Sequence, residues 1–427
     1  MPKGKIVLII IFGIIIFAVL LIFLGVVPGL QKNDPKNQIV SLEFWGVFDR
    51  RDVMEKATSI IPGFKITYKE VDAKNYEADL INALASDNGP DVFMVHNSWI
   101  PKHKDKLIPV TAKDLGISSL RDLYPTVVAQ DFAPDNYIYA LPLWMDNLAL
   151  FYNKDIFDQK GVLFPPKDWK EFQEAVSQIK EIDSSGNLVL PAASMGGSSK
   201  SVFKSQDILS LLMLQTGVKM VSDDFSRATF ASQGYKALDF YTDFSNPKSE
   251  FYTWNDSVGS SIDLFAKEKL GMMIGYASTL DAIKSRNQFI NFGVANLPIP
   301  KSGGARVDYA DYWGLAVSKK AKDPSGAWNF INSLAGNPQI AKIYSDEANR
   351  LPALRTLIAE KQNDPFWGVF AKQSLTSRSW PKIDDKQVDQ IFSDMISEVI
   401  LGQKTSARAL QEAETQVSDL MRARSQF

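Results

Sequence analysis

Residues 39–95 read IVSLEFWGVFDRRDVMEKATSIIPGFKITYKEVDAKNYEADLINALASDNGPDVFMV. Alternating apolar residues predict two strands, and helical spacing of apolar residues predicts a helix after each. In chain order these elements are 39–45, 52–60, 64–68 and 76–84. The apolar run at 91–95 follows the turn Asp87-Asn88-Gly89-Pro90 and is typical of a buried parallel strand. This order of elements predicts an α/β fold with a parallel sheet.

The rest of the chain continues the mixture of strands and helices. Extended or strand-like segments are expected at 139–153, 272–274, 289–294 and 313–317. Helices are expected at 205–214 and 234–244, and through the C-terminal part from about 388. Asp168 follows two prolines and precedes Glu171 by three positions, which predicts a capped helix start.

An apolar run without charge occupies residues 6–27, after Lys3 and Lys5. Such a run is long enough to cross the ~30 Å hydrocarbon core of a bilayer, and its positive flank should stay in the cytoplasm. A cleaved signal peptide has a shorter apolar stretch and a small-residue cleavage site. A buried core helix is the alternative, but such helices rarely lack a polar face. We predict a membrane anchor at 1–27, a polar tether at 28–37 and a single-pass protein with its body on the extracytoplasmic side.

The composition excludes several classes of function for the chain that follows the predicted anchor and tether. Of 427 residues, 45% are hydrophobic and 22% charged, and the formal net charge is −2, so no basic surface for nucleic acid is expected. The absence of cysteine excludes disulfides, a thiol nucleophile, cysteine-ligated zinc and a lipidated cysteine. Pro101 separates the two histidines, His96 and His103, so a histidine metal pair is not expected. No phosphate loop, dinucleotide fingerprint or serine-nucleophile elbow is present, which predicts no cofactor and no catalytic residues.

Short segments along nearly the whole body resemble a family of known binding proteins. They are LEFWG at 42–46, LAS at 84–86, GPDV at 89–92, ALP at 140–142, LFYNKD at 150–155, PPKDW at 165–169, GMMIGY at 271–276, VANLP at 294–298 and WGLAVS at 313–318. Together and in this order they are similar to the extracellular solute-binding proteins of ABC importers, in the group with maltose- and multiple-sugar-binding proteins. One departure is that many relatives carry a lipidated cysteine, whereas this chain has an apolar N-terminal run.

The resemblance implies a periplasmic-binding-protein-like (type II) fold of two α/β lobes, with the ligand in the cleft between them. It places the first lobe at 38–150, the second at 151–294, a return to the first at 295–317 and second-lobe helices at 318–427. Tyr152 and Asn153 match the family closely and are expected at an interlobe hinge. The implied partners are a small solute, the permease subunits of an ABC transporter and the bilayer through residues 6–27.

Ligands in open α/β sheets bind beyond the carboxyl ends of strands, so loops after predicted strands supply the candidate site. Aromatic rings cover the apolar faces of sugars, while amides and charged groups bind the hydroxyls. The candidates for ligand binding are Trp45, Asp49, Asn97, Trp99, Asp146, Asn147, Tyr276, Trp313 and Arg350. For each aromatic residue, core packing is the alternative, and Asp146 and Asn147 are as compatible with a hinge loop.

The expected function is that of a non-catalytic subunit that captures a sugar or oligosaccharide by lobe closure. Two alternatives remain open at this point. A glycoside hydrolase needs only two carboxylates at a suitable separation. A binder of another small solute on the same fold is the second alternative.

Overall fold

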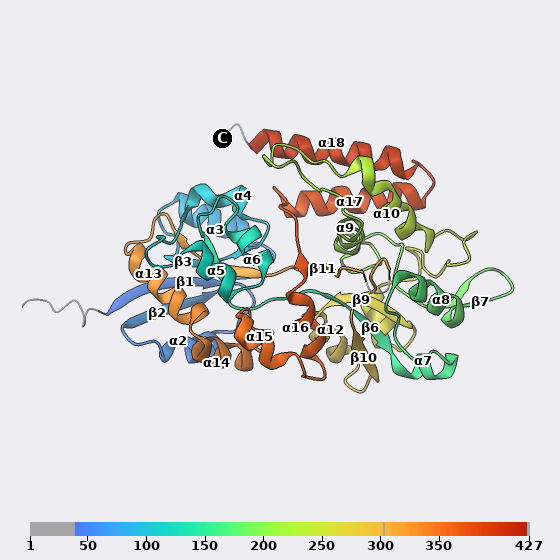
Figure 1. The fold of residues 1–427 in the computed structure, drawn as a ribbon, viewed down its shortest axis with the longest axis horizontal. Helices are drawn as coiled ribbons and strands as arrows, with labels where there is room; N and C mark the ends of the chain where they lie inside the picture. The colour runs from blue at the N-terminus through green and yellow to red at the C-terminus, as the bar shows by residue number, and fades with distance from the viewer. Residues whose placement is uncertain (1–38, 302–303, 425–427) are drawn as a thin grey trace, which may run out of the picture.

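The computed structural model describes residues 39–301 and 304–424 and contains two α/β lobes side by side (Figure 1). The predicted anchor at 6–27 and the tether at 28–37 lie outside these residues. Within the described ranges, no helix has the length and apolar character needed to cross a membrane.

The first lobe is built on a mixed sheet with the order β2-β1-β3-β12-β4, and β5 also pairs with β12. Its strands are β1 (Val40–Gly46), β2 (Phe64–Glu70), β3 (Val92–His96), β4 (Leu107–Ile108), β5 (Ala140–Pro142) and β12 (Trp313–Ser318). β1 is parallel to β2 and β3, as the alternating pattern of 39–95 predicts, while β12 is antiparallel to β3, β4 and β5. The fully buried Phe44 and Val92 belong to the core of this lobe.

Helices surround this sheet. They are α2 (Arg51–Ser59), α3 (Tyr76–Ala85), α4 (Ile100–His103), the short η2 (Lys104–Lys106), α5 (Ile117–Leu123), α6 (Thr126–Phe132), α13 (Pro324–Ile331), η3 (Asn332–Gly336), α14 (Pro338–Ala348) and α15 (Arg355–Lys361). α14 packs on α2, α13 packs on β12, and α15 packs on α5. The prediction placed all of residues 318–427 in the second lobe. The structure instead places α13, α14 and α15 in the first lobe, because the chain stays on this lobe after β12 before it crosses again.

The second lobe contains a three-stranded antiparallel sheet with the order β10-β6-β9. Its strands are β6 (Leu148–Asn153), β9 (Met272–Tyr276) and β10 (Phe292–Ala295). Its helices are α7 (Lys154–Lys160), α8 (Trp169–Ile179), α9 (Ser205–Gln215), α10 (Ala231–Asp243), α11 (Ser261–Ala266), α12 (Thr279–Arg286), α17 (Asp385–Ile400) and α18 (Ser406–Arg424). A small hairpin, β7 (Glu181–Ile182) with β8 (Leu188–Leu190), extends from the lobe.

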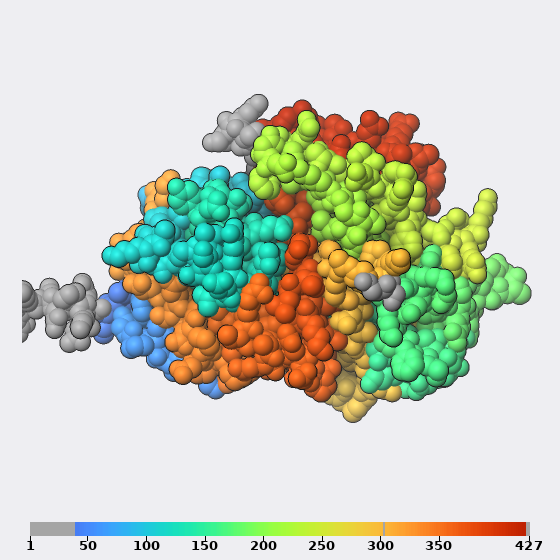
Figure 2. Space-filling view, viewed as in Figure 1, coloured from blue at the N-terminus to red at the C-terminus, as the bar shows by residue number. Residues whose placement is uncertain are grey.

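Within the described residues, the chain passes between the lobes at 143–147, at 296–312 and at 375–384. The first two segments pair with each other, because Asn147 bridges Ala310 and the amide of Asp311 donates to the carbonyl of Asp146 at 3.0 Å. The third segment contains β13 (Ser377–Arg378), which pairs with β11 (Asp308–Tyr309). In the space-filling view the lobes meet along a seam, and the orange region that includes α15 and α16 (Trp367–Ser374) spans its lower part (Figure 2).

Tyr152 and Asn153 were expected at a crossing, but they lie at the end of β6. Tyr152 pairs with Met272 and Gly293, and the Asn153 side chain accepts a hydrogen bond from the amide of Ile156 to cap α7. The structure therefore places both residues inside the second lobe, and the crossing ends before them.

Candidate functional site

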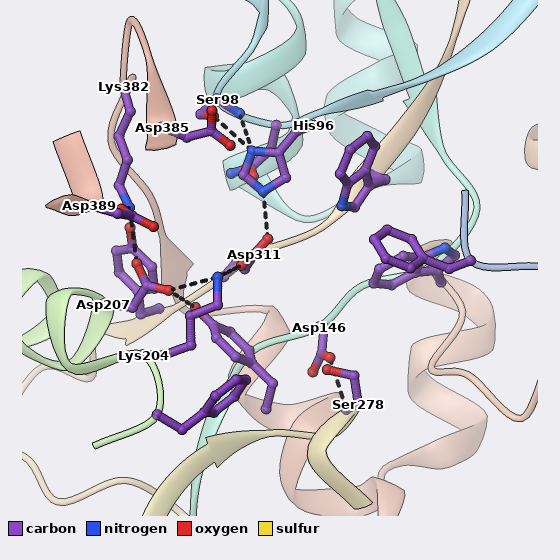
Figure 3. Close-up of a pocket in the computed structure, with 18 of the residues that line it drawn as sticks. His96, Ser98, Asp146, Lys204, Asp207, Ser278, Asp311, Lys382, Asp385 and Asp389 are labelled. Atoms are coloured by element: carbon purple, nitrogen blue, oxygen red, sulfur yellow. Dashed lines mark hydrogen bonds and ion pairs between the residues drawn. The ribbon is translucent and has the colours of Figure 1, made fainter. Parts of the chain in front are cut away.

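A cavity of about 440 Å³ lies between the two lobes (Figure 3). Its walls come from the loops after β1 and β3, the end of β9, the start of α9, the start of α17 and the crossing segments. The loops after β1 and β3 and the end of β9 are positions at strand ends, where α/β folds bind ligands. A second hollow of about 570 Å³ lies between 130–135 of the first lobe and 218–225 of the second, and Asn97 and Trp380 line both.

Aromatic rings from both lobes line the interlobe cavity. Phe48, Trp144 and Trp313 form one group, in which the Phe48 ring lies 5.3 Å from that of Trp313 and 6.4 Å from that of Trp144. The other rings are those of Phe203, Tyr276, Tyr309 and Trp380. Rings on opposite walls offer apolar faces to a flat, polar molecule held between the lobes.

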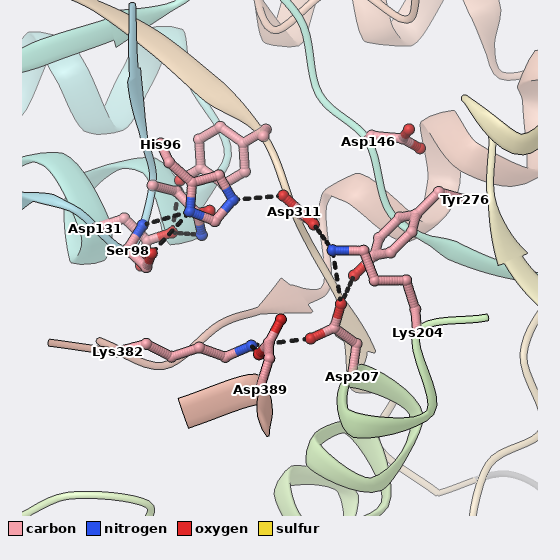
Figure 4. Close-up of polar contacts among 12 residues, drawn as sticks. His96, Ser98, Asp131, Asp146, Lys204, Asp207, Tyr276, Asp311, Lys382 and Asp389 are labelled. Carbon is pink, nitrogen blue, oxygen red and sulfur yellow. Dashed lines mark hydrogen bonds and ion pairs between the residues drawn. The ribbon is translucent and has the colours of Figure 1, made fainter. Parts of the chain in front are cut away.

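A chain of ion pairs runs along the cavity from the first lobe to the second (Figure 4). His96 Nε2 lies 2.6 Å from Asp311 Oδ1, and Lys204 Nζ lies 3.0 Å from Asp311 Oδ2. Lys204 Nζ also lies 3.5 Å from Asp207 Oδ2. The chain therefore connects the end of β3 with the start of α9.

A second lysine extends this chain to α17. Lys382 Nζ lies 3.0 Å from Asp207 Oδ1 and 2.7 Å from Asp389 Oδ1. Tyr276 donates a hydrogen bond to Asp207 Oδ2 at 3.0 Å, so this carboxylate joins three side chains. These contacts thus connect β9, the start of α9 and the start of α17 along this wall of the cavity.

These contacts shift the acid–base properties of the groups. Burial alone would raise the pKa of Asp311, but Lys204 and His96 hold it well below its ordinary value. Burial lowers the pKa of His96, yet Asp311 outweighs this and leaves the pKa raised. Burial also lowers the pKa of Lys204, but the carboxylates of Asp311 and Asp207 outweigh burial and leave this pKa raised. These contacts therefore favour the charged forms of Asp311, His96 and Lys204.

Asp146 and Arg350 occupy the junction next to the rings. The Asp146 carboxylate accepts hydrogen bonds from the amides of Ala277 at 2.8 Å and Ser278 at 3.0 Å, and burial raises its pKa to about 6. Arg350 Nε lies 3.2 Å from Asp49 Oδ1, and its guanidinium lies over the Trp144 ring at 4.4 Å.

Some polar atoms of the lining have no partner among the described residues. Asn97 Oδ1, Trp144 Nε1 and Asp385 Oδ1 are buried without a hydrogen bond. An unpaired buried polar atom costs free energy unless a bound molecule or water satisfies it. These atoms therefore mark where a ligand would find donors and acceptors.

The structure brings five of the nine predicted ligand-binding residues to this cavity: Asn97, Asp146, Tyr276, Trp313 and Arg350. Their contact with a ligand stays a prediction.

No group of three or more histidine, cysteine, aspartate or glutamate side chains in the described part of the chain could hold a metal ion.

The other four predicted residues lie outside the lining. Trp45 donates from Nε1 to Glu43 Oε1 at 2.7 Å, and Lys69 Nζ lies 3.8 Å from its ring. Asp49 is 2% exposed behind Arg350, and Trp99 packs against Trp313 with ring centres 5.0 Å apart. Asn147 is fully buried and donates to the Phe370 carbonyl at 3.1 Å. Asp49 and Trp99 thus contact lining residues from behind, and the strand-end rule cannot separate such residues from those that line the cavity.

Sequence reasoning also missed residues that the structure places in the lining. The main ones are Phe48, His96, Trp144, Lys204, Asp207, Asp311, Lys382, Asp385 and Asp389. His96 ends the strand 92–96 and precedes Asn97, so the strand-end rule could have included it. Lys204 has a left-handed backbone (φ 56°), which no pattern in its neighbourhood signals.

Two lobes joined by crossing segments around a lined cavity define the class of two-lobed binding proteins. The model of the bacterial extracellular solute-binding protein family matches residues 54–367. The chain belongs to this family, so the predicted resemblance is confirmed. Because the family consists of binding proteins, the interpretation as a non-catalytic protein is confirmed as well.

Individual relatives have low sequence identity to this chain. A binding protein of Brucella abortus is 23% identical over 218 residues, and the chain spans about half of that protein's length (50%). The multiple sugar-binding protein of Streptococcus mutans is 23% identical over 253 residues, which are 56% of each chain. The solved structure of a sugar-binding protein from Xanthomonas citri has a TM-score of 0.76 at 21% identity and covers 91% of this chain and 98% of that one. At this identity the structural likeness shows the two-lobed fold.

Proposed function

We propose that this protein is the membrane-anchored solute-binding subunit of an ABC importer and that it captures a sugar or oligosaccharide by lobe closure. The observation that carries the proposal is the interlobe cavity, in which rings from both lobes face buried carboxylates, an amide and an indole N–H. Sugars combine apolar faces with a rim of hydroxyls, and this lining offers a partner to each.

The fold supports closure as the capture mechanism. The cavity wall contains residues of both lobes, and the described chain passes between the lobes at three segments. A solute that contacts both walls favours the closed arrangement by its differential affinity for it. Sugar-binding names among the relatives, such as the protein of Streptococcus mutans, support the same ligand class.

Anchoring and transport partners are further parts of the proposal. The apolar run at 6–27 would hold the protein at the outer face of the membrane, next to the permease subunits. Tethering raises the effective concentration of the binding protein at its partner.

A thermal-shift screen of the full-length chain in detergent tests the ligand class. Sugars, oligosaccharides, polyols and amino acids are compared at equal concentration. We expect a sugar to stabilise the chain, by ~2.7 kcal/mol at a hundred times its dissociation constant. Stabilisation by amino acids alone, or by none of these solutes, contradicts the proposal.

Membrane fractionation tests the anchor separately. We expect the protein to stay with membranes after a carbonate wash, to be released by detergent, and to keep residues 1–27 in its intact mass. A soluble protein that has lost this segment contradicts the anchoring.

A further inference from the structure

The charges that line the interlobe cavity do not balance. Three side chains with a permanent positive charge lie there: Lys204, Arg350 and Lys382. Six carboxylates lie there: Asp146, Asp207, Asp281, Asp311, Asp385 and Asp389. Even with a positive His96, the lining has an excess of negative charge, which acts on any solute held in a water-poor space.

All three cations of this lining already have carboxylate partners. Lys204 pairs with Asp207 and Asp311, and Lys382 pairs with Asp207 and Asp389. Arg350 pairs with Asp49, which is almost fully buried. An anionic solute would therefore find no cation of the described lining available and would have to displace an internal partner. Such displacement leaves a buried carboxylate unpaired, at a high cost.

Three carboxylates of the lining form no ion pair with a basic side chain of the described chain: Asp146, Asp281 and Asp385. Asp146 is held by backbone amides. Asp385 Oδ1 is buried and has no hydrogen-bond partner. Asp385 acts electrostatically on His96, the residue before Asn97, and the close-up shows it near His96 and Ser98 (Figure 3).

Asn97 provides a second acceptor that is independent of the charges. Its side chain is 6% exposed, its Nδ2 donates to Asp131 at 3.0 Å, and its Oδ1 has no partner. Because Nδ2 is fixed by Asp131, the oxygen is the atom left for a ligand. Asn97 belongs to the first lobe and Asp385 to the second, so a donor between them would contact both lobes.

We propose that the solute carries a protonated amine among its hydroxyls, as an amino sugar does, and that the ammonium group binds at Asp385 and Asn97. This inference rests on the proposed function, since it names the kind of sugar. An ammonium group has three N–H donors and no acceptor, which suits two oxygen acceptors in an acidic cleft. Uronates and sugar phosphates are excluded by the same excess of carboxylates.

Calorimetric titration of the full-length chain with matched sugars tests this selectivity. The probes are glucosamine, glucose and glucuronate, the same three forms of galactose, and the β-1,4-linked dimers of glucosamine and glucose. We expect the amine of a matched set to bind about tenfold more tightly than the neutral sugar, the size of one charged hydrogen bond, and uronates not to bind.

The outcomes separate this inference from the proposed function. Equal or tighter binding of neutral sugars, or measurable binding of a uronate, overturns the amine inference and leaves a sugar-binding protein. Absence of binding by any of these probes, together with a negative sugar screen, overturns both.

Asp385→Asn tests the proposed contact, because it removes the charge and keeps the size. We expect the affinity for the amine to fall about tenfold and that for the neutral sugar to change little. Asp394→Asn is the matched control, since Asp394 is an exposed carboxylate on the same helix α17 and lies outside the cavity. An equal loss for amine and neutral sugar in Asp385→Asn contradicts the inference. If that variant does not fold, Asp385→Ser replaces it, because it also removes the charge at the proposed contact, and the expected direction is the same.

Discussion

At the scale of single residues, Trp313 connects the core of the first lobe to the cavity. Its ring meets those of Trp99, His96 and Phe48 edge to face, with centres 5.0, 5.2 and 5.3 Å apart. It also lines the cavity, half-buried at the start of β12. The surrounding rings fix its orientation before any ligand binds, which lowers the entropy cost of binding.

We expect Trp313→Ala to weaken sugar binding by ~1–2 kcal/mol, because a fixed aromatic surface is lost from the cavity. Titration calorimetry measures the affinity, and circular dichroism checks that the variant folds. Tyr235→Ala is the control, since this exposed ring lies on α10 away from the cavity. Equal affinities for Trp313→Ala and the native chain would show that the ring does not contact the ligand.

Asp146 gives a pH-dependent prediction. Burial raises its pKa to about 6 from 3.8, so the folded chain binds the proton more tightly than the unfolded chain. The resulting stabilisation is present below pH ~4 and is lost as the pH rises through ~6. Asp146→Asn removes this group from the titration.

Urea unfolding at several pH values measures the effect. Relative to Asp146→Asn, the native chain should lose about 2 kcal/mol of unfolding free energy between pH ~4 and ~7. A difference between native and Asp146→Asn that stays constant with pH would contradict the raised pKa.

At the level of single elements, the sequence around Asp168 was sufficient to predict where α8 begins. Asp168 accepts a hydrogen bond from the amide of Glu171 at 2.9 Å, and Glu171 Oε2 accepts one from the amide of Lys167 at 2.8 Å. The predicted cap is therefore confirmed, together with a reciprocal contact of the capping-box kind. The apolar residues Trp169, Phe172, Val176 and Ile179 of this helix are buried.

We expect Asp168→Ala to lower the unfolding free energy by ~1 kcal/mol, because an amide of the first turn loses its acceptor. Asp168→Ser should keep most of the stability, since a serine oxygen accepts the same bond. Urea denaturation compares the two variants. Equal losses of unfolding free energy in both variants would contradict the capping role of the Asp168 side chain.

The strands around the cavity show what the local sequence pattern can predict and what it cannot. Alternation correctly predicts β1 and β2, and the apolar run predicts β3, because each depends on a short stretch of chain. Alternation does not say which face of a sheet meets the other lobe. Trp45 is placed at a strand end as expected, yet its ring contacts Lys69 of β2 and lies outside the cavity.

At the scale of the whole molecule, the site forms only where remote segments converge. Lys204, Asp311 and Lys382 come from three separate parts of the chain, and none follows a predicted strand. The sequence therefore predicts the two-lobed fold and five lining residues, while the charged network depends on the crossing of the chain. After β12 the chain stays on the first lobe, so α13, α14 and α15 pack there and not with α17 and α18.

The central claim is that the lobes close around a sugar, and a distance between the lobes tests it most directly. The chain has no cysteine, so spin labels attach only at introduced sites. Ala78→Cys on α3 and Ser232→Cys on α10 are exposed positions, one on each lobe. Pulsed electron paramagnetic resonance of the doubly labelled, full-length chain should give a shorter distance at saturation with the sugar found in the screen. A distance distribution that is the same with and without saturating sugar would contradict closure of the lobes around the ligand.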